Sequence, residues 1–82
     1  MKFSLKITIS LKKGMLDPEA LAIKHALDNL GFNVDSLGTA RIFYIDIDAV
    51  DKDAAVSTGR EMCDRLLANP VIHSYDIEAL GV

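Results

Sequence analysis

Apolar and polar side chains alternate without a break from Lys2 to Lys12. Successive side chains of a β-strand point to opposite faces of the sheet, so this alternation predicts a strand with one buried and one polar face. The apolar side holds Phe3, Leu5, Ile7, Ile9 and Leu11, and the polar side holds Ser4, Lys6, Thr8 and Ser10.

The same alternation recurs twice later in the chain. A second strand is predicted from Thr39 to Asp48 and a third over roughly Ile72 to Leu80. The apolar side holds Phe43, Ile45 and Ile47 in the second strand and Tyr75, Ile77 and Ala79 in the third. Ile42, Tyr44 and Leu80 interrupt the polar side, which is therefore mixed in character.

The best-delimited helix is predicted from about Pro18 to Leu30. Asp17 suits the N-cap, where its side chain can accept a backbone N–H, and Pro18 suits the first helical position. Gly31 suits the C′ position that ends a helix. Leu16 and Leu21 have the spacing of a hydrophobic staple, and Ala20, Ile23, Leu27 and Leu30 form the apolar stripe.

A second helix is predicted from Lys52 to about Ala68. Asp51 can cap its start, and Pro70 prevents its continuation. The predicted buried stripe is Val56, Gly59, Cys63 and Leu66, flanked by Ala55, Met62 and Leu67. Gly59 is interpreted as a site where the helix packs closely against its neighbours.

These elements predict a single α+β domain over residues 1–82. The linker from Phe32 to Gly38 has room for a short extra strand. With that strand the order becomes β-α-β-β-α-β, the ferredoxin-like arrangement. Its antiparallel sheet would carry both helices on one face.

Composition adds an expectation of self-association. Half of the residues are hydrophobic, whereas a domain of this size has a high ratio of surface to volume. Part of the apolar material must then remain exposed, and exposed apolar patches often mark subunit interfaces. The net charge of −3 and the scattered basic residues argue against a nucleic-acid partner.

The location predicted from the sequence is the cytoplasm. No apolar run approaches the roughly 20 residues that span a membrane, and Lys2, Lys6 and Lys12 interrupt any signal-peptide pattern. The single cysteine, Cys63, excludes an internal disulfide and suits a reducing compartment.

The chain contains no recognisable catalytic, cofactor or metal constellation. Cys63 falls on the predicted apolar stripe, and His25 and His73 lie in different elements. A zinc site would need paired ligands such as C-x-x-C. The acidic residues Asp46, Asp48, Asp51 and Asp53 lack the glycine and glutamate of a calcium loop, so a solvated strand face leading into helix caps is the favoured interpretation.

Two segments resemble a known family. One runs from Leu11 to Ala20 (LKKGMLDPEA) and is followed by Ala26-Leu27 and Leu30-Gly31, and the other runs from Glu61 to Glu78 (EMCDRLLANPVIHSYDIE). Together they resemble PurS, the small subunit of phosphoribosylformylglycinamidine synthase, over nearly the whole chain. The resemblance weakens after Arg41, where many members carry an R-x-G-K stretch and this chain continues with Ile42 and Phe43.

The resemblance implies a non-catalytic role in de novo purine synthesis. The family's complex is an ATP- and glutamine-dependent C–N ligase, in which a PurQ-type glutaminase releases ammonia and a PurL-type synthetase binds ATP and Mg. The small subunit bridges the two as a homo-oligomer, a dimer or a tetramer. This chain would then bind no cofactor itself and would contact neither nucleic acid nor membrane.

The expected contact residues lie in the two proline-containing turns, and local roles compete with that interpretation. Capping already accounts for Asp17 and Pro18, and helix termination accounts for Asn69 and Pro70. The candidate contacts are Leu16, Asp17, Pro18, Glu19, Asn69, Pro70, Val71, Ile72, His73 and Tyr75.

Two other classes of function remain open. An ACT-type sensor of small molecules would use the glycine-bearing loop Lys12-Lys13-Gly14, although the chain carries no attached enzyme to regulate. An RNA-binding module would need exposed aromatic residues in basic surroundings. Tyr44 is the aromatic residue expected on the mixed polar side of the sheet, and Asp46 and Asp48 flank it there.

Overall fold

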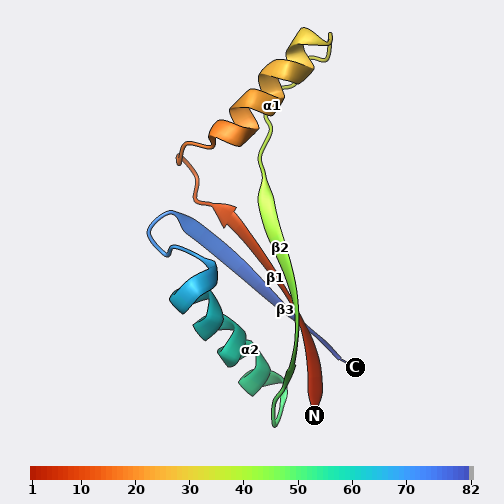
Figure 1. Ribbon diagram of the computed structural model, residues 1–82, viewed down its shortest axis with the longest axis vertical. Coiled ribbons are helices and arrows are strands. Elements are labelled where there is room, and N and C mark those ends of the chain that lie inside the picture. The colour runs from red at the N-terminus through yellow and green to blue at the C-terminus, as the bar shows by residue number, and fades with distance from the viewer. Residues whose placement is uncertain (82) are drawn as a thin grey trace.

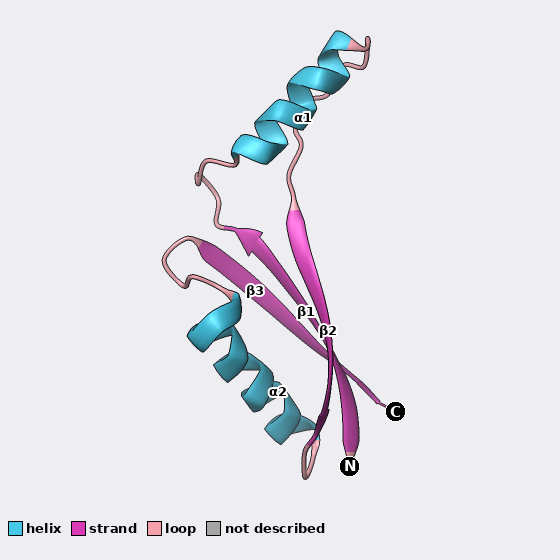
Figure 2. Cartoon of the chain, in the orientation of Figure 1, coloured by secondary structure: helices cyan, strands magenta, loops and turns pink. Residues whose placement is uncertain are grey.

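A computed structural model describes residues 1–81 and shows three strands and two helices (Figures 1 and 2). The order is β-α-β-α-β, which confirms the α+β class and each strand and helix start to within one residue. The elements are β1 (Lys2–Leu11), α1 (Pro18–Asn29), β2 (Ala40–Asp48), α2 (Lys52–Met62), the π-helical turn η1 (Cys63–Leu67) and β3 (His73–Gly81).

The three strands form one antiparallel sheet in the order β2-β1-β3. In its register, Leu5 of β1 lies opposite Ile45 of β2 and Ala79 of β3. The apolar sides of the three strands therefore share one face, called the core face here. The opposite face, called the open face, carries the polar residues of β1.

Helix α2 covers the part of the core face formed by β1 and β3. Leu5 and Ile7 of β1 are fully buried where they meet Ala55 of α2 and Cys63 of η1, which are also fully buried. Gly59 allows this close approach, because a Cβ atom at this position would lie 2.9 Å from Cδ1 of Leu5. The prediction of a close-packing glycine is confirmed.

The ferredoxin-like prediction is wrong in two respects for residues 1–81. The segment from Phe32 to Gly38 forms no strand, so the sheet has three strands and not four. The backbone N–H of Val34 donates instead to the Asp28 carboxylate at 3.2 Å, which holds this segment against α1 and away from the sheet.

The second error concerns α1, which was expected beside α2 on the core face. Helix α1 projects beyond the end of the sheet and makes few contacts with it (Figure 1). The radius of gyration is 16.2 Å, whereas a compact chain of this length would have about 12 Å. Without a fourth strand to direct its return, the chain leaves β1, forms α1 in isolation and comes back into β2.

The end of the second helix also differs from the prediction. The α-helix stops at Met62 and continues as η1, where the N–H of Ala68 donates to the carbonyl of Cys63 at 2.9 Å. The wider turn shifts the helical periodicity. Leu66, which was predicted on the buried stripe, is therefore 84% exposed, while Leu67 packs against the core.

Candidate functional site

The first predicted contact segment, Leu16 to Glu19, forms the start of α1. Asp17 caps the helix by accepting the backbone N–H of Ala20 at 2.9 Å, and its other carboxylate oxygen accepts the hydroxyl of Thr39 at 2.7 Å. The second bond ties the start of α1 to the residue just before β2. Leu16 is 72% exposed, and Pro18 and Glu19 also face solvent.

The hydrogen bonds of Asp17 lead to a testable prediction about the stability of α1. The bond from Ala20, followed by that from Thr39, lowers the pKa of the carboxyl below its ordinary range. A group whose pKa is depressed by folding stabilises the fold above its unfolded pKa and loses that contribution as the pH falls through its folded value. Asp17→Ala is expected to raise amide hydrogen exchange throughout α1 at neutral pH, because this helix has little packing to support it.

Asp17→Asn is the matched control for that measurement, because it keeps the capping oxygen and removes the charge. As the pH falls through the lowered pKa of Asp17, the wild-type chain should approach the exchange rates of the asparagine variant. Equal exchange in the wild-type and alanine chains would contradict the capping role.

The second predicted segment forms a tight turn between η1 and β3. The carbonyl of Asn69 accepts the backbone N–H groups of Ile72 and His73, and its side-chain oxygen accepts that of Val71 at 3.0 Å. The backbone N–H of Asn69 donates in turn to Nδ1 of His73 at 2.9 Å. Asn69, Pro70 and Val71 are exposed at the tip, with Val71 at 74%.

Lys12 attaches this turn to the end of β1. Its backbone N–H donates to the carbonyl of Ile72 at 2.8 Å, and its ammonium donates to the carbonyl of Pro70 at 2.6 Å. Lys12 was not among the predicted contact residues. Its pairing across the fold connects positions 58 and 60 residues apart in the chain, which the sequence pattern does not reveal.

The two segments meet at one polar cleft of about 500 Å³ at the end of the sheet. Glu19 from the first segment and His73 from the second both line it, together with Arg41 and Leu67. Tyr75 lies away from the cleft on the core face, where its hydroxyl donates to Asp64 at 3.2 Å. Partial burial, reinforced by this bond, raises the pKa of Tyr75.

An apolar groove that the sequence pattern did not predict lies between α2 and β2. The groove has a volume of about 480 Å³, and its lining residues are Ile45, Thr58, Glu61, Met62, Arg65, Leu66 and Leu67. It exists because α2 packs mainly on β1 and β3 and leaves the apolar side of β2 only partly covered. The apolar side of β2 was visible in the sequence, but the exposure of Leu66 depends on the π-helical turn.

The side chains considered for chemistry do not form a reactive centre. Burial raises the pKa of the Cys63 thiol, and the nearby Asp64 carboxylate adds to the shift. Within residues 1–81, no cluster of histidine, cysteine and carboxylate side chains has the geometry to hold a metal ion. Neither described helix is long and apolar enough to cross a bilayer.

Comparisons with known proteins give a consistent family. The model of the PurS family, described as phosphoribosylformylglycinamidine (FGAM) synthase, matches residues 4–81. The PurS subunit of Methanothermobacter thermautotrophicus is 44% identical over 77 residues, covering 94% of this chain and 92% of that protein.

Solved structures agree with this match. The crystal structure of Methanocaldococcus jannaschii PurS superposes with a TM-score of 0.87 at 40% identity, covering 98% of both chains. A structure of PurLQS from Thermotoga maritima contains a chain with a TM-score of 0.87 and 25% identity, covering 98% of this chain and 99% of that one. The chain therefore belongs to the PurS family, the small subunit of FGAM synthase in purine biosynthesis.

Proposed function

We propose that this chain is the non-catalytic assembly subunit that joins a PurL-type synthetase to a PurQ-type glutaminase. The observation that carries the proposal is the match to the chain in the Thermotoga maritima PurLQS structure, over nearly the full length of both. ATP and Mg then bind to the synthetase, and the glutaminase supplies ammonia. The small subunit contributes surfaces and no reacting groups.

Self-association is part of this proposal. The α2–β2 groove lacks a covering helix, and α1 lacks a sheet to cover. Ile23, Leu27 and Leu30 have helical spacing along α1, and Leu30 is 74% exposed. Helix α1 of a second copy would pack into the groove of the first. The helix of the first copy would pack into the groove of the second in the same way, which gives a closed, reciprocal dimer.

The exposed tips at the end of the sheet are proposed as contacts with the two partner subunits. Leu16 and Val71 are large apolar residues that solvent reaches, at 72% and 74% exposure. Asp17, Asn69 and His73 stabilise the two turns in the same region through their hydrogen bonds. Their expected contribution to partner binding is to position Leu16, Pro70 and Val71.

Reconstitution tests the assembly role. The chain is mixed with the synthetase and glutaminase of the same complex, and product formation is measured with glutamine and, separately, with ammonium as nitrogen source. Omitting the chain should abolish the glutamine-dependent reaction and spare the ammonium-dependent one, because only the first needs the subunits to be joined. Equal glutamine-dependent rates with and without the chain would overturn the proposal.

A further inference from the structure

The open face of the sheet has an uneven distribution of charge. Strand pairing places four carboxylates on it, from Asp46, Asp48, Asp76 and Glu78, and two ammonium groups, from Lys2 and Lys6. Its formal charge is therefore −2, two-thirds of the −3 carried by the whole chain. The face is a main source of the protein's acidity.

The local contacts leave the carboxylates of β3 unpaired. Lys2 lies 3.7 Å from Asp48, and Asp46 accepts the Ser4 hydroxyl at 2.6 Å. In the described part of the chain, neither Asp76 nor Glu78 has an ion-pair partner. Both lie on an edge strand with exposed side chains, so their field extends into the solvent.

Apolar residues lie beside these charges on the same face. Tyr44 is 72% exposed, Ile42 49% and Leu80 40%. Tyr44 faces Lys6, which in turn faces Glu78 on the other side of β1. An apolar surface next to unpaired charge has the composition of a protein interface, where aromatic residues supply contact area and charges steer association.

We propose that the open face docks a heterologous protein surface that presents lysine or arginine beside an apolar patch. This inference rests on the proposed function and identifies the partner as a basic surface on the PurL-type or PurQ-type subunit. A second copy of this chain is the disfavoured occupant, because two such faces would bring two charges of −2 together. The proposed dimer uses the core face and leaves the open face accessible.

The test is a charge-neutralising double variant, Asp76→Asn with Glu78→Gln. Binding of the full chain to the synthetase and to the glutaminase is measured by biolayer interferometry over a range of salt concentrations. The variant should bind one partner roughly ten-fold more weakly at low salt, mainly through a slower association rate, and should show a shallower salt dependence. Tyr44→Ala should instead raise the dissociation rate.

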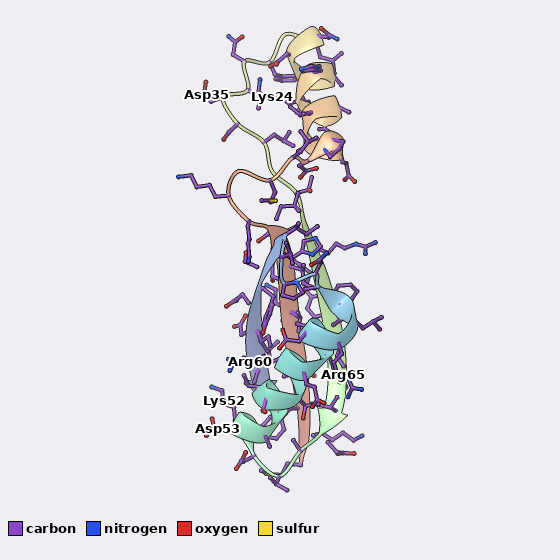
Figure 3. The ribbon with its side chains drawn as sticks, turned by 90° about the vertical axis from the view of Figure 1, so that its left-hand side faces the viewer. Lys24, Asp35, Lys52, Asp53, Arg60 and Arg65 are labelled. Carbon is purple, nitrogen blue, oxygen red and sulfur yellow. The ribbon has the colours of Figure 1, made fainter. Side chains whose placement is uncertain are left out.

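The matched control is Asp35→Asn with Asp53→Asn, which makes the same change in net charge elsewhere. Figure 3 shows these carboxylates at opposite ends of the molecule, in the loop after α1 and at the start of α2. An equal loss in the control would overturn the proposal, because net charge alone would then act. So would a double variant that binds like the wild type.

Other outcomes separate this inference from the proposed function. Wild-type protein that binds neither partner at any salt concentration would overturn both. Wild-type binding that the double variant retains would overturn the docking face alone. A heavier oligomer of the double variant in light scattering would assign the open face to a second copy, and would overturn the heterologous occupant.

Discussion

Gly59→Val is expected to lower the free energy of unfolding by about 1–3 kcal/mol, the usual cost of overpacking a well-packed site. A Cβ atom here would lie 2.9 Å from Cδ1 of Leu5 and 3.5 Å from two carbons of Ile77. Leu5 is fully buried. Relief of the clash therefore requires either a new Leu5 rotamer within a close-packed core or movement of α2 away from β1 and β3.

Two companion variants separate this clash from backbone effects. Ser57→Val places the same branched side chain at an exposed position of the same helix, where no clash occurs and the change in helix propensity is small. Gly59→Ala gains about 1 kcal/mol of helix propensity that offsets part of the strain. Urea unfolding should rank Gly59→Val as the least stable of the three, and equal midpoints for both valine variants would refute the packing argument.

Much of the fold could be predicted from local patterns. Strand alternation places Leu5, Ile7 and Ile9 on the core face, where all three are buried. Asp17 and Asp51 cap their helices as expected. Gly31 ends α1 with φ +99, where the N–H of Phe32 donates to the carbonyl of Leu27. Such signals involve residues a few positions apart, and the sequence displays them directly.

The missed features depend on contacts that no local pattern contains. The position of α1 is decided by whether a fourth strand forms, and the bond between Asp28 and Val34 turns that segment away from the sheet. Leu66 lies at a buried position of an ideal α-helix, and the π-helical turn moves it to the surface. The family resemblance pointed to the proline turns and gave no indication of the groove beside Leu66.

The wrong predictions for the position of α1 and for the burial of Leu66 concern one feature of the structure. Helix α1, which was predicted to lie beside α2 on the core face, instead projects beyond the sheet, and the apolar surface between α2 and β2 remains open as the groove. In the proposed dimer, each chain supplies one helix and one groove to an interface that it does not close internally. The radius of gyration is 16.2 Å, against about 12 Å for a compact chain. This difference reflects the projection of α1 beyond the sheet.

Leu66→Asp is accordingly expected to convert the proposed dimer into a monomer, weakening association roughly 100-fold or more, since burial of an unpaired carboxylate costs several kcal/mol. At 84% exposure, Leu66 adds little to the stability of the single chain, so circular dichroism and the thermal midpoint should stay close to wild type. Size-exclusion chromatography with light scattering gives the mass directly.

Val50→Asp provides the control for this last prediction, because Val50 is 80% exposed in the turn between β2 and α2 and does not line the groove. It should leave the oligomer intact. Ile23→Asp on α1 should dissociate the proposed dimer as Leu66→Asp does, since the two side chains would lie on opposite sides of the proposed interface. A Leu66→Asp chain with unchanged mass would show that the copies meet elsewhere. Loss of association in Leu66→Asp and Ile23→Asp, with Val50→Asp unaffected, would place α1 in the groove of its partner.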